Sequence, residues 1–465
     1  MHPQNMKRLI FFIITTIVLI AMLISCNKEE REFTVSFKIN FNVGFEIPSQ
    51  IIKKGEKAVK PVISYTISYH TLIAWYKEAE LVNEWNFADD LVTSDITLYA
   101  MWSQNEYTVS FESSGGSTVL SQIVKGGENA IEPEDPTRSG YLFVAWYNDA
   151  ELVNEWNFAF SVTDHIKLYA KWQLPDPSVK ISGLTIDNYP RVDCSTSAEP
   201  LNILIACKLL DVAHRWVRNG YNSAWSIEPN LKNGIEKFRD RVKAAETHQS
   251  FINLIDNTTD LILTARTISS DEKEYADAKG VSLIETPIAL DAFIFIVHPT
   301  NPIKSLTIKQ VQDIYTGKIT NWKEVGGNDA KINPYIRNAN SGSQETMKML
   351  IMKDMDFMNY PESPDIAFTM QGTFDAVGSD NNSICYSFYY YKEQILRGTH
   401  TKTISIEGVL PSQENIFNNS YPLITEVTAG IRSDADRSSM TYKLYELLQT
   451  EDGKRVVSES GYIPN

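Results

Sequence analysis

An arginine and two serines lie close together in the segment Arg337-Asn338-Ala339-Asn340-Ser341-Gly342-Ser343. A predicted helix from Gln344 to Met352 follows this turn. The first turn of a helix offers unpaired backbone N–H groups, and serine hydroxyls and an arginine fork add further donors. Such a combination suits a tetrahedral oxyanion such as phosphate or sulfate. The same residues are also compatible with a capped helix that has an arginine on its surface.

The N-terminus has the pattern of a lipoprotein signal peptide over residues 1–25. Lys7 and Arg8 precede an apolar run, Leu9 to Ile24, which is shorter than the roughly 20 residues that span a bilayer. Its end, Leu23-Ile24-Ser25-Cys26, resembles the bacterial lipobox, in which the cysteine is diacylated. We therefore expect Cys26 to be lipidated, and an uncleaved membrane anchor is the alternative. The next residues, Lys28-Glu29-Glu30, resemble the surface-export signal of Bacteroidetes lipoproteins, which implies the outer membrane, at its periplasmic or cell-surface face.

Composition excludes several classes of function. The 465-residue chain has a formal net charge of −15, which disfavours binding to nucleic acid or to an anionic membrane surface. Besides Cys26 there are three cysteines, an odd number without a CxxC or Cys/His cluster, at Cys194, Cys207 and Cys385. We expect them to be small buried side chains rather than disulfides or metal ligands, and we expect no cofactor.

A repeat occupies the first third of the mature chain. The segment Ala74-Trp75-Tyr76 and the stretch 80–88 recur as Ala145-Trp146-Tyr147 and 151–159. Alternating strands are predicted at 33–37 and 96–102, and again at 107–111 and 166–172. These units, 33–102 and 107–172, resemble the Listeria–Bacteroides (internalin B-type) repeat of bacterial surface proteins, a small β-grasp-like module. The resemblance implies adhesion or display, and a spacer role is equally compatible. The Pro-rich segment 173–179 is a predicted linker.

The remainder, residues 180–465, alternates apolar runs with helical patterns and predicts an α/β fold. Strands are expected at 261–263, 293–297 and 331–333, and helices at 201–210, 249–255 and 308–315. Three segments resemble those of periplasmic phosphate-binding proteins and occur in the same order: Val192–Leu201, Val297–Pro302 and Ile314–Trp322. The first contains Asp193 and Ser195-Thr196-Ser197. The motifs Ile406–Val409 and Tyr421–Leu423 continue this resemblance.

The resemblance implies a two-lobed type II periplasmic-binding fold behind the two repeat modules. Lobe one would comprise about 180–290 and 405–465, and lobe two about 291–404, with crossings near 289–293 and 404–408. It further implies a monomer that binds inorganic phosphate or a similar oxyanion between the lobes and delivers it to an ABC transporter permease. Carried over by motif, the ligand-binding residues would be Ser195, Thr196, Ser197, Thr247, Arg266, Arg337, Ser341, Gly342 and Ser343.

The chain departs from the family pattern at several of these places. The glycine-rich loop of lobe one is replaced by Glu246-Thr247-His248-Gln249-Ser250, and expected glycines are Cys194 and Cys385. Arg266 stands where the family has an aspartate acceptor, and it either faces the cleft or pairs with Asp271 or Glu272. An aspartate acceptor lets a site demand a protonated ligand and reject sulfate, so without it the sequence does not assure selectivity for phosphate.

An enzymatic function has less support, because the sequence contains no nucleophile elbow, Walker loop, zinc-binding His-Glu-x-x-His or paired-carboxylate motif. Three classes stay open: an oxyanion-binding receptor, a surface adhesin whose binding domain has lost or changed its ligand, and a hydrolase of unrecognised type. The anion cluster around Arg337 favours the receptor, and we expect no catalysis.

Overall fold

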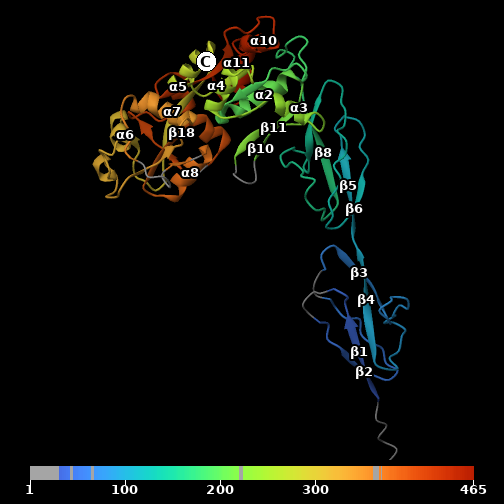
Figure 1. Cartoon of the computed structure of the whole chain (residues 1–465). Coiled ribbons are helices and arrows are strands. Elements are labelled where there is room, and N and C mark those ends of the chain that lie inside the picture. Colours follow the sequence, from blue (N-terminus) through green and yellow to red (C-terminus); the bar gives the residue numbers. More distant parts are fainter. Residues whose placement is uncertain are drawn as a thin grey trace, which may run out of the picture. The chain divides into compact units, whose positions relative to one another are not determined.

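The structure is a computed structural model that describes residues 31–41, 46–63, 67–218, 224–359, 366–367, 369–398 and 400–465 (Figure 1). The predicted signal peptide and Cys26 lie outside these residues. The chain divides into two compact units. The first contains most of the two repeats, and the second runs from Ala170 to Asn465 and includes residues 115–117 and 135–145. Among the described residues, none of the helices has the length and apolar character needed to cross a bilayer.

Each repeat forms a four-stranded mixed sheet with the same strand order. The first sheet has the order β2-β1-β4-β3 and the second β6-β5-β8-β7. In both, the first and last strands pair in parallel, with Val35 opposite Ile96 and Val109 opposite Ile166. The equivalent topology confirms the predicted duplication. The strands are β1 (Glu32–Lys38), β2 (Gln50–Lys53), β3 (His70–Tyr76), β4 (Ile96–Gln104), β5 (Glu106–Glu112), β6 (Gln122–Lys125), β7 (Leu142–Tyr147) and β8 (Ile166–Gln173).

The shared aromatic residues form the repeat cores. Trp75 and Trp146 are 1% and 2% exposed, so these large side chains are removed from water in both copies. Each packs edge-on against a phenylalanine of the first strand: the ring centroids are 5.1 Å apart for Phe37 and Trp75, and 4.9 Å apart for Phe111 and Trp146. Aromatic pairs in this geometry add to the stabilisation from burial. The repeated residues Trp75 and Trp146 are therefore core residues.

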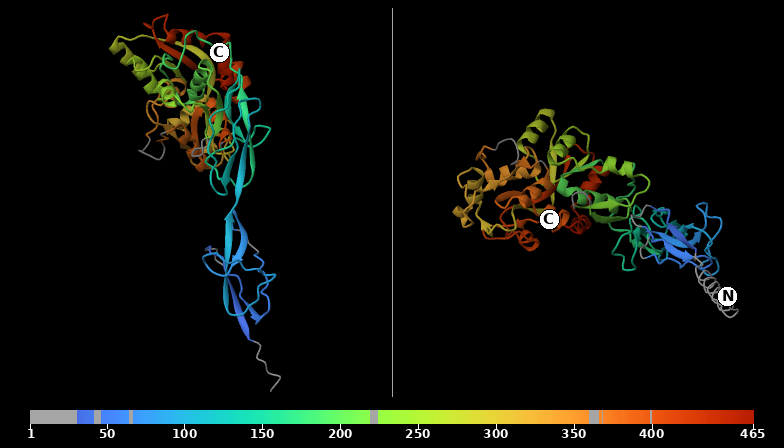
Figure 2. Two further views of the ribbon diagram at one scale, coloured as in Figure 1. Left: turned by 90° about the vertical axis from the view of Figure 1, so that its right-hand side faces the viewer. Right: turned by 90° about the horizontal axis from the view of Figure 1, so that it is seen from below.

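The second unit is organised by one long strand. Strand β13 (Leu283–Val297) pairs along its first part with β21 (Ile424–Arg432) and along its last part with β18 (Ser383–Phe388). Together they belong to an eight-stranded sheet with the path β15-β18-β13-β21-β12-β9. We call the part built on β9 (Val192–Cys194), β12 (Leu261–Thr264) and β21 lobe one, and the part built on β18 and β15 (Asn333–Pro334) lobe two. The two lobes are seen in Figure 2, with lobe two mainly orange.

Helices and short strands complete the lobes. Lobe one contains α2 (Glu199–Leu209), α3 (Ile235–Arg241), α4 (Thr247–Ile255), α5 (Ser270–Lys279), α10 (Met440–Leu447), α11 (Glu451–Glu459), the 3₁₀ turn η1 (Thr196–Ala198), the hairpin β10 (His214–Arg218) and β11 (Trp225–Pro229), and β22 (Ile463–Pro464). Lobe two contains α6 (Ile308–Tyr315), η2 (Trp322–Val325), α7 (Gly342–Thr346), the π-helical η3 (Met347–Met352), α8 (Met370–Ser379), the π-helical η4 (Tyr391–Ile395), β14 (Ser305–Leu306), β16 (Ile336–Arg337), β17 (Ile366–Ala367), β19 (Lys402–Thr403) and β20 (Ser405–Ile406). The short helix α9 (Gln413–Phe417) precedes β21.

Three sequence expectations need correction. The return from lobe two was expected near 404–408, but β20 pairs with β14 and β19 pairs with the lobe-two end of β13, so the chain returns only at β21. The strand expected at 331–333 is shifted to Asn333–Pro334, because only these residues reach β18. The helix expected from Gln344 begins at Gly342 and widens into a π-helix at Met347. The strand expected at 293–297 begins ten residues earlier, at Leu283, and the other predicted strands and helices are present with end shifts of at most two residues.

The segment predicted as a linker is attached to lobe one. Strand β8 ends at Gln173, and the Pro-rich segment begins with the next residue. Asp176 then accepts hydrogen bonds from Arg455 Nη1 at 2.7 Å and from Lys208 Nζ at 3.4 Å. These two cations and the Ser178 hydroxyl hold the pKa of the Asp176 carboxyl well below its usual range, against the opposing effect of burial. The segment is therefore fixed to α2 and α11 at this point.

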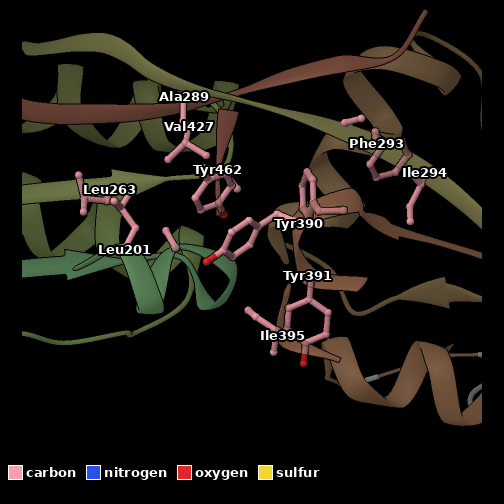
Figure 3. Packing of buried hydrophobic residues seen from close by; sticks show 14 of the residues in the cluster. Leu201, Leu263, Ala289, Phe293, Ile294, Tyr390, Tyr391, Ile395, Val427 and Tyr462 are labelled. Atoms are coloured by element: carbon pink, nitrogen blue, oxygen red, sulfur yellow. The ribbon is translucent and has the colours of Figure 1, made fainter. Parts of the chain in front are cut away.

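A pair of stacked tyrosines lies where the two lobes join. The rings of Tyr390 and Tyr462 are 3.6 Å apart and nearly parallel, with 5° between their planes (Figure 3). The Tyr390 hydroxyl donates to the Ser460 carbonyl, and the Tyr462 hydroxyl donates to the Ser197 carbonyl. Beside them, buried Asp291 of β13 accepts from the backbone N–H of Tyr390 at 3.0 Å. The junction thus links the Ser195–Ser197 loop to the segment that follows β18.

Candidate functional site

Lobe one contributes the loop between β9 and α2 and the start of α4. The Ser195 hydroxyl accepts from the backbone N–H of Ala265 at 3.0 Å and lies 2.9 Å from the Thr247 hydroxyl. Both side chains are buried. Within the described residues, the backbone N–H groups of Thr196 and Ser197 have no hydrogen-bond partner. These groups stay available because a helix leaves its first N–H groups unbonded.

A buried aspartate positions both lobe-one segments, and the sequence reasoning missed this role. Asp193 Oδ1 accepts from the backbone N–H groups of Cys194 and Ala245, each at 2.8 Å. Its second oxygen accepts from Asn253 Nδ2 at 2.7 Å. Asp193 therefore fixes the position of the Ser195 loop relative to α4 and the residues just before it. The available signal was its place in the motif Asp193-Cys194-Ser195-Thr196.

Lobe two contributes Arg337 and the Ser-Gly-Ser turn. Arg337, 5% exposed, ends the short strand β16, and Nε donates to the carbonyl of Ala367 on the neighbouring strand at 2.9 Å. Nη1 lies 3.4 Å from the Ser343 hydroxyl. The Ser341 hydroxyl accepts from Gln344 N at 3.3 Å and so caps the helix, as the sequence indicated. Gln344 in turn accepts from the Arg337 backbone N–H and from the Tyr386 hydroxyl, which fixes the turn against β18.

These groups surround one small cavity of about 20 Å³. On this measure a cavity for one water takes about 10–15 Å³, so the space suits a single small ion. All the ligand residues predicted from the sequence lie on its wall except Arg266. The wall consists of Ser195, Thr196, Ser197, Glu246, Thr247, Ala265, Arg337, Ser341, Gly342, Ser343, Met370 and Phe388.

The Arg337 guanidinium has no direct ion-pair partner among the described residues, and the one carboxylate on the wall, Glu246, is exposed. In the part of the chain that the structure describes, the Arg337 guanidinium contacts only neutral oxygens, those of Ala367, Ser343 and Asn338. Its burial lowers the pKa of Arg337 from the ordinary value. A buried charge without a counter-ion costs free energy, because it has lost its hydration without gaining a partner. An anion in the cavity would supply that partner, together with the hydroxyl and N–H donors opposite.

Arg266 does not belong to this wall. Its guanidinium forms a bidentate ion pair with Glu272 of α5, at 2.8 Å from Nη1 and 2.6 Å from Nη2. Glu272 is fully buried and also accepts from the Ser269 backbone N–H and contacts His248. The sequence left open whether Arg266 faces the cleft or forms a structural ion pair, and the structure contains the ion pair. A carboxylate this buried requires a cationic partner, which explains why the side chain turns away from the cavity.

The segment that stands in place of the glycine-rich loop has a backbone conformation typical of glycine at Glu246. Glu246 has φ 69° and ψ 163°, a region that side chains disfavour at a cost of about 1–3 kcal/mol. This conformation brings Thr247, as the first residue of α4, against Ser195. The side chain of Thr247 does not cap α4, so it is not needed for that purpose. The Glu246 side chain is exposed at the cavity mouth.

The cysteines behave as the sequence predicted. Cys194, Cys207 and Cys385 are all buried free thiols. Neither Cys194 nor Cys385 lies on the cavity wall, although each stands where a glycine was expected. Among the described residues there is no cluster of three or more His, Cys, Asp or Glu side chains that could hold a metal ion.

Gly342 of lobe two lies against Thr247 of lobe one. A Cβ added there would lie only 2.4 Å from the Thr247 hydroxyl oxygen, so either the Thr247 side chain or the lobes must shift to admit it. We expect Gly342→Ala to weaken anion binding about tenfold, as titration calorimetry would measure. Gly378→Ala is the matched control, because its added Cβ would meet nothing closer than 3.9 Å. Equal affinities of the two variants would show that closure does not depend on this contact.

Comparison with known proteins agrees with this architecture. Residues 231–437 match the family model of the PBP superfamily domain, and residues 33–101 and 107–171 match the Listeria–Bacteroides repeat domain. A membrane protein of Evansella cellulosilytica is 34% identical over 43% of this chain and 29% of its own length. The phosphate-binding protein PstS of Bacillus subtilis is 27% identical over 42% of this chain and 62% of its own length. The chain therefore spans less than two thirds of the length of both relatives.

A solved structure is also similar to part of the chain. An ABC-type phosphate transport receptor from Vibrio cholerae is 24% identical, with a TM-score of 0.42, over 58% of this chain and 98% of that chain. The two family matches coincide with the two kinds of sheet described above. Two segments of the chain therefore match the Listeria–Bacteroides repeat domain, and residues 231–437, within the two-lobed α/β unit, match the PBP superfamily domain.

Proposed function

We propose that this chain binds phosphate, or a similar tetrahedral oxyanion, in the cavity between the lobes of its PBP domain. The observation that carries the proposal is the buried guanidinium of Arg337, which forms no ion pair with any described residue and lies on the wall of a cavity lined by serine and threonine hydroxyls. Charge-assisted hydrogen bonds to an anion would stabilise the closed arrangement. The resemblance to phosphate-binding proteins supports the same ligand.

The chain is a binding protein and not an enzyme, in keeping with the phosphate-binding proteins that it resembles. As a solute-binding protein it would deliver its anion to an ABC transporter permease and act as a monomer. The repeats would then hold the PBP domain away from the membrane.

Selectivity is expected to be modest. Phosphate carries a proton near neutral pH and sulfate does not, so only a carboxylate acceptor in the site distinguishes them strongly. The cavity wall has a single carboxylate residue, Glu246, whose side chain is exposed at the mouth, and Arg266 cannot accept a hydrogen bond. We therefore expect sulfate to bind with an affinity within about a hundredfold of that of phosphate.

Titration calorimetry of a soluble chain lacking residues 1–26 tests the proposal. Phosphate should bind with one site per chain and should raise the melting temperature by mass action. If neither phosphate nor sulfate binds at millimolar concentration, the proposal fails. The alternative of a cell-surface adhesion or display lipoprotein would then account for the repeats.

Membrane attachment through Cys26 is a separate prediction. We expect the mature protein to fractionate with the outer membrane, held by acyl chains that each contribute about 0.8 kcal/mol per buried CH₂. Cys26→Ser should move the protein to the soluble fraction, with Cys207→Ser as a control that keeps the anchor. Recovery of the Cys26→Ser protein with the membrane would refute lipid anchoring.

A further inference from the structure

A cation–π contact joins the two lobes outside the anion cavity. Arg397 lies just beyond η4 in lobe two, and its guanidinium carbon is 4.5 Å from the ring centroid of Trp216 and 4.8 Å from that of Trp225. Both tryptophans belong to the hairpin β10–β11 of lobe one. An arginine within about 6 Å of an aromatic ring centroid is attracted to the face of that ring. None of these three residues lies on the wall of the anion cavity.

The hairpin carries both rings on one face. In its antiparallel register Trp216 is opposite Ile227, and Trp225 is opposite Arg218, so the two tryptophans are diagonal neighbours on the same side. The hairpin is a separate two-stranded sheet beside the eight-stranded one, and β11 contacts η4 directly. An aromatic face of lobe one is therefore placed against one segment of lobe two.

The same end of η4 contacts lobe one at a second place. Arg397 Nε donates to the carbonyl of Gln394 at 2.9 Å, which ties the guanidinium to η4. The Gln394 side chain lies against Gly461, between α11 and β22, because a Cβ added to Gly461 would be 2.8 Å from Gln394 Cδ. The end of η4 is thus held between the hairpin and the C-terminal segment of lobe one.

We propose that Arg397, Trp216 and Trp225 form an interlobe clamp that favours the closed arrangement of the lobes before an anion binds. The apparent affinity of a ligand is reduced by the fraction of protein that is not in the binding-competent state. A clamp that raises the closed fraction therefore tightens the binding of every anion that the closed cavity accepts, by the same factor. The affinity effect rests on the proposed function, whereas the clamp itself makes no contact with the anion.

Arg397→Ala should weaken the binding of phosphate and of sulfate equally, by about three- to tenfold in titration calorimetry. The Arg397 side chain keeps contact with solvent, which limits the strength of the contact. Arg138→Ala is the matched control, because Arg138 also lies over two rings, those of Tyr141 and Trp172 in the second repeat, and it should change affinity less than about twofold. An unchanged affinity of Arg397→Ala, or a loss for only one of the two anions, would overturn the clamp.

A double-mutant cycle assigns the effect to the contact. Trp225→Leu should weaken anion binding by a factor similar to that of Arg397→Ala. Combining the two changes should then cost little more than either alone, because both remove one interaction. Fully additive losses would show that the two residues act separately, and the clamp would be wrong.

A pair of spin labels tests the clamp in the absence of any anion. Labels on the exposed positions Glu274 of α5, in lobe one, and Lys309 of α6, in lobe two, would be introduced as Glu274→Cys and Lys309→Cys. In pulsed electron paramagnetic resonance, Arg397→Ala should shift the distance distribution of the ligand-free protein, and Arg138→Ala should not. Identical distributions for the wild type and Arg397→Ala would refute the clamp. If the distributions differ and neither phosphate nor sulfate binds, the clamp stands and the proposed function fails.

Discussion

Replacing Arg337 by alanine should lower the affinity for phosphate by about one to two powers of ten. A charge-assisted hydrogen bond contributes roughly 1.5–3 kcal/mol, and each 1.4 kcal/mol changes the dissociation constant about tenfold. Arg337 is the only cationic residue on the cavity wall, which is defined by described residues, so no neighbour replaces its charge. Titration calorimetry with phosphate measures the change directly.

Lysine at the same position should restore little of the lost affinity. The ammonium is a point charge and cannot reproduce the fork that reaches Ala367, Ser343 and the anion together. Arg432→Ala is a suitable control, because Arg432 likewise donates to a backbone carbonyl, that of Ile255, but lies outside the cavity. If Arg337→Ala keeps its fold and its phosphate affinity, the anion binds somewhere else.

The site residues could be predicted from the sequence wherever the groups that would bind the anion lie close together along the chain. Ser341 and Arg337 lie within a few residues of each other, and the loop at Ser195 leads directly into a helix. Hydroxyls and N–H groups at such places face outward for reasons of helix geometry alone. The motif order then indicated that the two segments meet in space, and the structure brings Ser195, Thr247 and Arg337 to one cavity.

The missed features depend on contacts between distant segments. The direction of Arg266 is decided by Glu272, whose burial follows from the packing of α5 and not from any local pattern. The role of Asp193 depends on Ala245 and Asn253, which no spacing rule relates to it. In the same way, the return to lobe one could not be placed, because residues 402–406 remain paired with strands about a hundred residues earlier.

The lobe junction contains a titratable group that should make stability depend on pH. Asp291 is fully buried, and its burial raises its pKa to about 7 from an ordinary value near 4. The backbone N–H groups of Ala292 and Tyr390 donate to Oδ1 and oppose this shift, while Oδ2 has no partner among the described residues. The nearby phenols of Tyr389, Tyr390 and Tyr462 are neutral in this range, since their own pKa values are raised.

The sign of the effect follows from proton binding. Between about pH 4 and pH 7 the folded protein keeps a proton on Asp291 that the unfolded chain releases. The free energy of unfolding should therefore fall as the pH rises through this window, and the loss should level off above about pH 7. The shift corresponds to at most about 4 kcal/mol, since one pKa unit is worth about 1.4 kcal/mol.

Asp291→Asn should therefore stabilise the protein at pH 8 by about 1–3 kcal/mol and should have little effect at pH 4. The amide keeps an oxygen that can accept from Ala292 and Tyr390, and its NH₂ group takes the place of a protonated oxygen that has no partner. Urea unfolding from pH 4 to pH 8 measures both curves, with Asp434→Asn as a control at an exposed carboxylate that pairs with Arg432. The wild-type curve should fall relative to that of Asp291→Asn between pH 4 and 7. Parallel curves for the two proteins would show that Asp291 is ionised in the folded state at its ordinary pKa, and that the junction tolerates the buried charge.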